Sequence, residues 1–114
     1  VARGEATAAA SARHVWIVGE LAMGYGRAGQ QHQAAALYRE LVERSTREYV
    51  ESVWLAGAAE WAGRGDEALA HLRASADAHQ PLFAMAGRHG FRLFVPQWEQ
   101  RAEYHEILRG LGWA

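Results

Sequence analysis

Apolar residues recur every three or four positions along most of the chain, a period that predicts amphipathic helices. Gly29 and residues 63–65 are the expected breaks between helices, because glycine readily adopts the left-handed conformation that ends a helix. Asp66 is the expected N-cap of the helix that follows. Residues 81–95 are also compatible with a strand, but we expect a short helix and an apolar loop, since no other segment supplies a strand to pair with it. The predicted helices span about 11–28, 31–45, 47–62, 66–78 and 96–110.

Two parts of the chain match each other when one is shifted by 34 residues. The matched pairs are Leu21 with Leu55, Ala22 with Ala56, Gly29 with Gly63, Ala34 with Ala68, and Tyr38 with Leu72. A period of about 34 residues is typical of helix-turn-helix repeats, in which each unit buries its apolar side against a neighbour. We therefore expect a single all-α domain over residues 1–114, with repeat 1 at about 15–48, repeat 2 at about 49–82 and a divergent capping segment at 83–114.

The composition and charge of the chain argue against several classes of function. The chain has 114 residues, enough for one domain with a modest core. Half of the residues are hydrophobic and the formal net charge is −1, so nucleic acid is not expected as the main ligand. The absence of cysteine excludes disulfides, thiolate catalysis and cysteine-based zinc sites. No apolar run reaches the roughly 18 residues of a membrane span, and a start at Val1 is consistent with a piece of a longer polypeptide.

Two short motifs have functional meanings that we do not adopt. Gly24 to Gly29 spell G-x-G-x-x-G, which binds dinucleotides only between a strand and a helix. No second parallel strand is expected, so we interpret Gly24 and Gly26 as positions where helices pack closely. Residues 64–66 spell Arg-Gly-Asp, an adhesion tripeptide, but a turn followed by a helix cap explains it.

The titratable residues predict neither a catalytic nor a metal site. His71 and His79 lie two helical turns apart, too far for one ion, and the cluster of His105 with its neighbouring glutamates is expected on a solvated flank. Glu99 and Glu103 share a face of the predicted last helix, which we interpret as solvated rather than as an acid–base pair. We therefore expect no enzymatic activity, no cofactor and no metal.

The 34-residue units resemble the tetratricopeptide repeat (TPR) family, whose pattern is Trp-x2-Leu-Gly-x2-Tyr, then Ala-x3-Phe, then Pro. Residues 15–48 supply Val18, Leu21, Ala22, Tyr25, Ala34 and Tyr38 at the matching positions, and residues 49–82 supply Ser52, Leu55, Ala56, Ala59, Ala68 and Leu72. The first-position Trp is absent from both units, and the final Pro is displaced. The resemblance implies a right-handed superhelical stack of helix-turn-helix units, closed by divergent C-terminal capping helices.

A second resemblance concerns two shorter segments. Residues 65–72 (GDEALAHL) and 104–112 (YHEILRGLG) are similar to the closing part of TPR arrays in bacterial multidomain regulators. In those proteins the array follows a nucleotide cyclase, protein kinase or DNA-binding domain. The resemblance implies a cytoplasmic C-terminal sensor or scaffold module for signalling or transcription regulation, with catalysis, if any, in an upstream domain and with neither nucleic acid nor membrane as partner.

In the TPR family the first helix of each repeat lines a concave groove that binds a protein or peptide segment. Carried over to the matching positions, the groove residues are Trp16, Glu20, Met23, Arg27, Val50, Val53, Trp54, Glu60 and Trp61. Aromatic side chains with a polar rim are typical of peptide recognition. Three alternatives stay open: Phe91, Phe94 or Trp98 folds over these rings, two copies pair as a homodimer, or the indoles enclose a small apolar effector. The sequence contains neither Lys nor Asn, which argues against the TPR mode that clamps a C-terminal carboxylate.

Overall fold

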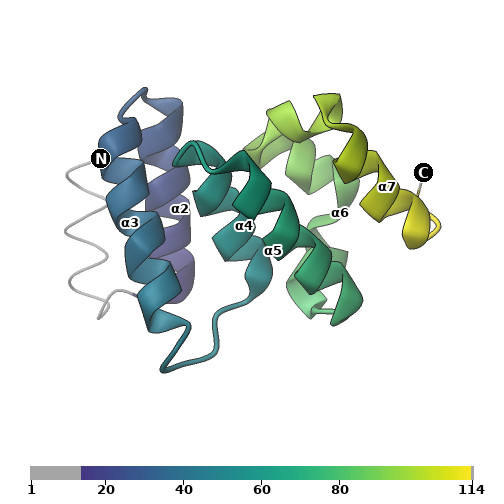
Figure 1. The fold of residues 1–114 in the computed structure, drawn as a ribbon, viewed down its shortest axis with the longest axis horizontal. Coiled ribbons are helices and arrows are strands. Elements are labelled where there is room, and N and C mark those ends of the chain that lie inside the picture. Colours follow the sequence, from purple (N-terminus) through teal and green to yellow (C-terminus); the bar gives the residue numbers. More distant parts are fainter. Residues whose placement is uncertain (1–13, 114) are drawn as a thin grey trace.

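The computed structural model describes residues 14–113, without the side chains of residues 81 and 82. Every regular element of this part is a helix (Figure 1), so the predicted all-helical class is confirmed and residues 81–95 form no strand. The elements are α2 (Val15–Arg27), α3 (Gln31–Arg44), α4 (Ser52–Trp61), α5 (Gly65–Asp77), α6 (Pro81–Phe94), the 3-10 helix η1 (Pro96–Gln100) and α7 (Ala102–Gly110). The predicted beginning of the first helix at Ser11 lies outside the described residues.

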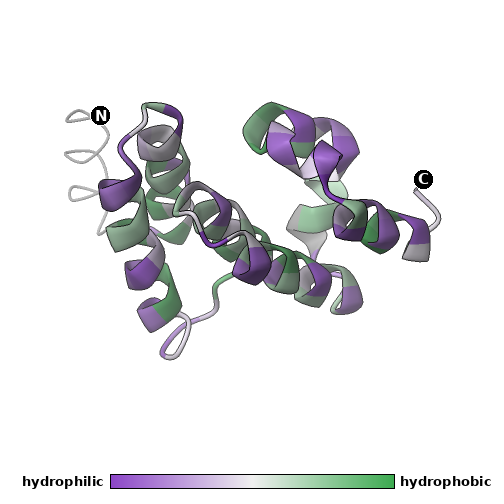
Figure 2. Ribbon diagram, turned by 45° about the horizontal axis from the view of Figure 1, so that its top comes forward, coloured by the Kyte–Doolittle hydropathy of each residue, from purple (hydrophilic) through white to green (hydrophobic). Residues whose placement is uncertain are grey.

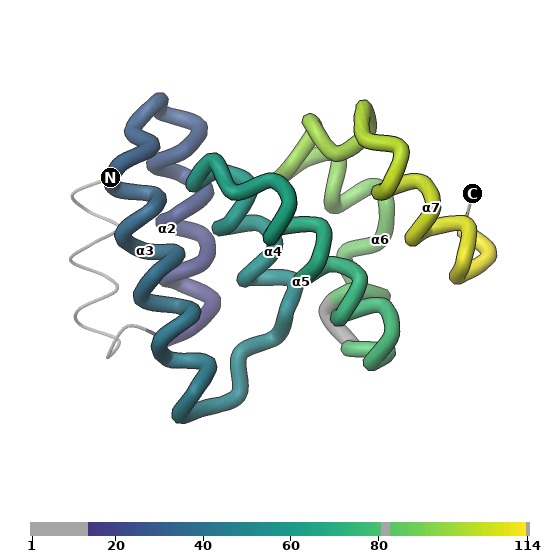
Figure 3. Tube along the Cα trace, viewed as in Figure 1, coloured from purple at the N-terminus to yellow at the C-terminus, as the bar shows by residue number. Residues whose placement is uncertain are grey.

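The first four helices form two hairpins that pack side by side. Figure 3 shows the chain passing from the α2/α3 hairpin to the α4/α5 hairpin, and then to α6 and α7. Helix α4 contacts both α2 and α3. The helix bounds correspond at an offset of 34 residues: α2 ends at Arg27 and α3 begins at Gln31, while α4 ends at Trp61 and α5 begins at Gly65.

The turns inside the two hairpins have the same geometry. Gly29 has a φ of 80° and Gly63 a φ of 83°, a conformation that glycine adopts without steric cost. In the first turn the N–H of Gln30 donates to the carbonyl oxygen of Tyr25 at 2.8 Å, and the equivalent hydrogen bond 34 residues later is also 2.8 Å long. Both predicted glycine breaks are confirmed.

Residues 34 apart also occupy corresponding positions in the hydrophobic core. The buried pairs are Leu21 and Leu55, Ala22 and Ala56, Ala34 and Ala68, and Tyr38 and Leu72. The four alanines expose no surface, because the helices approach too closely there for a larger side chain. The first helices of the hairpins, α2 and α4, carry mostly hydrophobic residues, whereas α3 and α5 mix hydrophobic and hydrophilic ones (Figure 2).

Glycines of α2 face tryptophans of α4. A Cβ atom added at Gly19 would lie 2.7 Å from the ring of Trp54, and one added at Gly26 would overlap the Cβ atom of Trp61. The two helices are therefore in close contact at two points that are two turns apart. The interpretation of Gly26 as a close-packing position is confirmed. The same interpretation of Gly24 is wrong, because nothing lies within 4 Å of a Cβ atom placed there.

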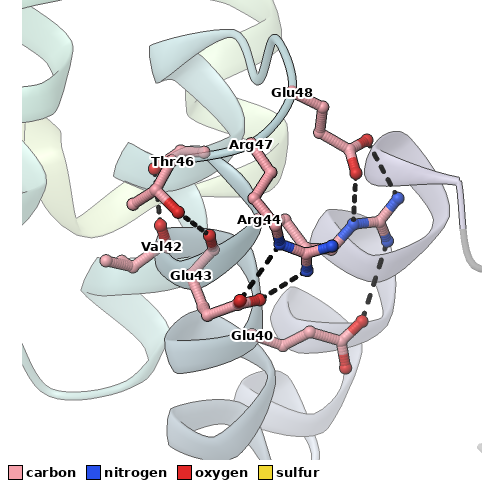
Figure 4. A network of polar contacts seen from close by, with 8 residues as sticks. Glu40, Val42, Glu43, Arg44, Thr46, Arg47 and Glu48 are labelled. Atoms are coloured by element: carbon pink, nitrogen blue, oxygen red, sulfur yellow. Dashed lines mark hydrogen bonds and ion pairs between the residues drawn. The ribbon is translucent and has the colours of Figure 1, made fainter.

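The connection between the two hairpins is longer than predicted, since α4 begins at Ser52 rather than near residue 47. Helix α3 ends where the hydroxyl of Ser45 donates to the carbonyl oxygen of Val42 at 2.6 Å. The hydroxyl of Thr46 donates to the carbonyl oxygen of Glu43 at 2.7 Å (Figure 4). The hydroxyls bond to carbonyls at the helix end, where the ladder of helical hydrogen bonds stops, and the carbonyl oxygen of Glu43 also accepts the backbone N–H of Thr46 at 3.2 Å. The chain therefore leaves the helix and continues as a loop.

Several ion pairs lie around the C-terminal end of α3 (Figure 4). Arg44 lies between two glutamates, 3.7 Å from Glu40 and 3.1 Å from Glu48, and Arg47 lies 2.6 Å from Glu43. The pair of Arg47 with Glu43 is exposed, so water and salt screen it and it adds little stability. The Arg44 side chain is only 14% exposed, and it connects the last turn of α3 to the following loop.

The start of α5 differs from the prediction that Asp66 caps it. The helix begins at Gly65, and Arg64 occupies the N-cap position without a capping hydrogen bond from its side chain. Asp66 lies in the first turn, where a negative charge interacts favourably with the helix dipole. Its carboxylate is 3.7 Å from the guanidinium of Arg101.

The C-terminal part was predicted incorrectly in two places. Helix α6 continues on both sides of a kink at Gly87 (φ 59°, ψ 178°), where we expected a short helix and a loop. The expected single helix 96–110 is interrupted at Arg101, whose backbone is extended (φ −104°, ψ 122°). In one continuous helix, residues six apart point about 120° away from each other. The interruption instead lets Trp98 and Tyr104 enter the same core, with 1% and 0% exposure and ring centroids 5.8 Å apart.

Candidate functional site

An apolar cavity lies between the first two hairpins and the C-terminal segment. Its volume is about 90 Å³. One wall consists of Glu20 and Met23 from α2 and of Val53, Trp54 and Gly57 from α4. The opposite wall consists of Ala86, Phe91, Phe94, Val95 and Trp98 from α6 and η1. We call this space the aromatic cavity, because four of its lining residues carry aromatic rings.

Helix geometry explains why these residues meet. On α2, Glu20 and Met23 are three residues apart, and on α4, Val53 and Gly57 are four apart, so each pair lies on one side of its helix. On α6, Phe91 and Phe94 are three residues apart after the kink at Gly87, and Val95 follows directly as the residue between α6 and η1. The cavity therefore lies where one face of each of three helices converges.

The buried part of the cavity is apolar, and the carboxylate of Glu20 lies at its solvent-exposed side. Phe91 and Trp98 are buried, at 4% and 1% exposure, and their ring centroids are 5.7 Å apart in an edge-to-face arrangement. Phe94 is 45% exposed, Trp54 is partly exposed and Glu20 is exposed, so these residues lie toward solvent. Among the described residues that line the cavity, Glu20 is the only ionisable one. Within residues 14–113 it forms no ion pair.

Two predicted groove residues hold the C-terminal segment in place. The indole N–H of Trp61 donates to the carbonyl oxygen of Phe94 at 3.0 Å. Glu60 accepts a hydrogen bond from the indole N–H of Trp98 at 2.8 Å and lies 3.5 Å from the guanidinium of Arg101. Its side chain is 14% exposed. The carboxylate of Glu60 is thus already engaged inside the chain.

The other predicted groove residues are dispersed. Trp16 is 51% exposed and Val50 is buried at 7% exposure, and neither lines the aromatic cavity. Arg27 is exposed, and its guanidinium carbon lies 6.0 Å from the centroid of the Phe94 ring. The predicted residues that the structure brings together are Glu20, Met23, Val53 and Trp54.

The aromatic residues of the tail contribute to the site but do not fill it. Phe91, Phe94 and Trp98, which the sequence suggested as a cover for the groove, form the second wall of the cavity. Ala86 and Val95 were not foreseen as lining residues. Helical spacing alone does not identify either residue, because Ala86 lies before the kink at Gly87 and Val95 has a non-helical backbone (φ −139°, ψ 68°).

A second polar cluster links α3 to α5. The hydroxyl of Tyr38 donates to Glu67 at 2.7 Å and, since its one hydrogen is used there, accepts the Nε2–H of His71 at 2.9 Å. Burial and the bond to Glu67 raise the pKa of Tyr38, and burial lowers the pKa of His71. Tyr38 and His71 therefore stay neutral near pH 7. We interpret the cluster as a structural connection between the hairpins.

The motifs set aside in the sequence occupy ordinary structural positions. Gly24 and Gly26 lie within α2, and Gly29 forms a turn between two helices rather than between a strand and a helix. Residues 64–66 form the start of α5. Residues 14–113 contain no group of three or more His, Asp or Glu side chains arranged to hold a metal ion. In the same region no helix has both the length and the apolar character needed to cross a bilayer.

Glu99 and Glu103, which we expected on one helix face, lie in different elements and pair with different arginines. Glu99 is in η1 and binds the guanidinium of Arg88 through two hydrogen bonds of 3.0 and 2.8 Å. Arg88 and a second arginine, Arg92, lower the pKa of Glu99 to about 2. Glu103 lies in α7 and pairs with Arg73 at 3.4 Å. The prediction of a shared face is wrong, because the interruption at Arg101 separates the two residues.

Comparison with known proteins identifies no relative of this chain, so any proposal about its function depends on the geometry of the site. No protein-family model matches the chain, and no curated protein or solved structure matches it significantly.

Proposed function

We propose that this chain is a non-catalytic protein–protein interaction module built from TPR-like repeats in a right-handed stack, and that the aromatic cavity receives one side chain of a bound partner segment. The observation that carries the proposal is the position of the cavity. Its first wall is formed by Glu20, Met23, Val53 and Trp54, four of the residues that the family resemblance assigns to a peptide-binding groove. The equal turn geometry of the two hairpins supports the repeat architecture.

The size of the cavity favours a side chain over a free effector molecule. The volume of the aromatic cavity is about 90 Å³. Pockets for small organic ligands typically measure about 300–1,000 Å³. One anchoring side chain fits, and the rest of a partner segment would lie outside, along exposed residues such as Phe94 and Trp16. The alternative function, sensing of a small apolar effector, has less support from this volume.

The resemblance of residues 65–72 and 104–112 to the ends of bacterial TPR arrays suggests the biological setting. In this proposal the chain is the cytoplasmic C-terminal part of a bacterial signalling or transcription-regulating protein. A domain upstream of the chain would carry any catalytic or DNA-binding activity, and binding of a partner here would regulate it.

Selection of peptides from a displayed library on the immobilised chain tests the proposal. Selected peptides should bind the wild type and lose at least about tenfold in affinity to Trp54→Leu, because truncation of a central aromatic contact costs more than about 1.4 kcal/mol. Val42→Ala is the matched control, since Val42 is an exposed apolar residue on α3 that does not line the aromatic cavity.

The results have distinct meanings. Equal binding of the selected peptides by Trp54→Leu, with its fold verified by circular dichroism, would refute the proposal. Sedimentation of the wild type separates a further case: a dimer that Trp54→Leu dissociates would replace a foreign partner by a second copy of the chain. Failure to select any peptide, together with a monomeric wild type, would also count against the proposal.

A further inference from the structure

We propose that the side chain received by the aromatic cavity is an arginine of the partner segment. This inference rests on the proposed function, because it assigns the chemistry of the same site. The structural reason is that the cavity combines aromatic walls with the exposed carboxylate of Glu20, which forms no ion pair within residues 14–113.

The walls suit a planar, weakly hydrated cation. Trp54, Phe94, Phe91 and Trp98 line the cavity, and aromatic rings attract a cation that lies within about 6 Å of the ring centroid. A guanidinium group stacks on such rings and loses less hydration than an ammonium group when it leaves water. An arginine side chain also brings an apolar stem, which would contact Met23.

The protein itself contains an arginine in this arrangement. The guanidinium carbon of Arg27 lies 6.0 Å from the centroid of the Phe94 ring, although Arg27 does not line the cavity. The Phe94 ring, which is 45% exposed, thus already interacts with one guanidinium group of the chain itself. A partner arginine would extend this pattern into the cavity.

Glu20 attracts a cation to the site, whereas Arg27, whose guanidinium carbon lies 6.0 Å from the centroid of the Phe94 ring, opposes one. Glu60 is satisfied by Trp98 and Arg101, so its charge is balanced within the chain. Glu20 is exposed and lines the cavity without an ion pair in the described part of the chain. A carboxylate pairs with guanidinium through two parallel hydrogen bonds, which fixes the orientation of the arginine. A neutral or acidic side chain would leave this carboxylate without a partner or repel it.

The size of the cavity agrees with this occupant. The cavity has a volume of about 90 Å³, far below the roughly 300–1,000 Å³ of pockets that hold whole organic ligands, so it suits the compact planar end of one side chain.

Small probes test the inference without knowledge of the partner. The full chain is titrated with methylguanidinium chloride, with methylurea, which has the same shape but no charge, and with methylammonium chloride, all at constant ionic strength. The readout is the NMR signal of each indole N–H. We expect methylguanidinium to shift the signals of Trp54 and Trp98, at concentrations where the signal of Trp113, outside the cavity, stays unchanged. Methylurea should bind about 2- to 30-fold more weakly, the range expected from the energy of a cation on aromatic rings.

Matched variants assign the effect to the site. Glu20→Gln keeps the size of the side chain and should weaken methylguanidinium binding at least threefold. Glu106→Gln, which removes an exposed charge on α7, should leave binding unchanged and controls for the change in net charge. Arg27→Gln should strengthen binding, because it removes a like charge beside Phe94.

Three outcomes would overturn the inference: equal binding of methylurea, an unchanged affinity of Glu20→Gln, or stronger binding of methylammonium, which would indicate lysine. In each of these cases the proposed function can still stand, because the peptide selection with Trp54→Leu tests it independently. Loss of peptide binding by Trp54→Leu, combined with selected peptides that contain no arginine, would likewise retain the interaction module and reject its arginine anchor.

Discussion

Replacement of Gly26 by alanine is expected to destabilise the protein, although alanine is the better helix former. The added Cβ atom would overlap the Cβ atom of Trp61 on α4. A Cβ atom is fixed to the backbone, so rotation of the indole ring cannot relieve the overlap and α4 must shift. Overpacking of this kind costs about 1–3 kcal/mol, while the gain in helix propensity is at most about 1 kcal/mol. With a gain of about 1 kcal/mol, the expected net loss is up to about 2 kcal/mol in the free energy of unfolding, and the overlap with a fixed Cβ atom favours the upper part of this range.

Gly24 provides the matched control on the same helix. Nothing lies within 4 Å of a Cβ atom placed at this position, so Gly24→Ala gains helix propensity without a steric cost. We expect it to stabilise the protein by about 0.5–1 kcal/mol. The two identical substitutions, two residues apart, should therefore have effects of opposite sign.

Urea unfolding followed by circular dichroism measures both variants. In thermal unfolding, each kcal/mol corresponds to a shift of about 4–8 °C in Tm for a domain of about 100 residues. Equal free energies of unfolding for the two variants, or a stabilised Gly26→Ala, would refute the reasoning that close contact between α2 and α4 determines the cost.

Three further predictions concern other features of the structure. His79 follows α5 with a φ of 53°, a conformation that strains non-glycine residues. His79→Gly should therefore raise the free energy of unfolding by about 0.5–1 kcal/mol and increase Tm. An unchanged Tm would contradict this prediction. Tyr38→Phe removes the hydroxyl that bonds Glu67 and His71, and urea unfolding should show a loss of about 1 kcal/mol, absent if the bonds do not form in solution. The pKa of Glu99 is lowered from 4.5 to about 2 by its two arginines, so the stability that it contributes is present above about pH 4.5 and is lost as the pH falls toward 2. Unfolding measured from pH 6 to 2 should show wild type losing about 1–2 kcal/mol more than Glu99→Gln, and parallel pH profiles would exclude this role.

Local sequence features determined the helical class and the turns of the first two hairpins. The apolar spacing of three and four residues is a property of neighbouring positions, and it predicted helices that the structure confirms. The glycines at 29 and 63 end helices because only the local backbone conformation matters there. The match of Leu21 with Leu55 and of Ala22 with Ala56 identified buried positions, since both hairpins bury the same side.

The sequence predicted the site only in part, because local periodicity does not reveal contacts between distant segments of the chain. Glu20, Met23, Val53 and Trp54 were found because they lie on one side of consecutive helices, which periodicity reveals. The role of Glu60 was not foreseen. Its carboxylate binds an indole 38 residues later in the chain, and nothing in its local sequence indicates that partner.

What the sequence by itself determined is therefore the helices of the two hairpins, their buried sides and the two glycine turns. These features follow from patterns among residues near one another in the chain. The tertiary structure decided the rest: the kink at Gly87, the interruption at Arg101 and the convergence of the C-terminal aromatic rings on α2 and α4. The interruption is stabilised because Trp98 and Tyr104 become buried together, a gain of hydrophobic contact that exists only after distant segments have met. For this reason the aromatic cavity is a property of the packed molecule and not of any one segment of its sequence.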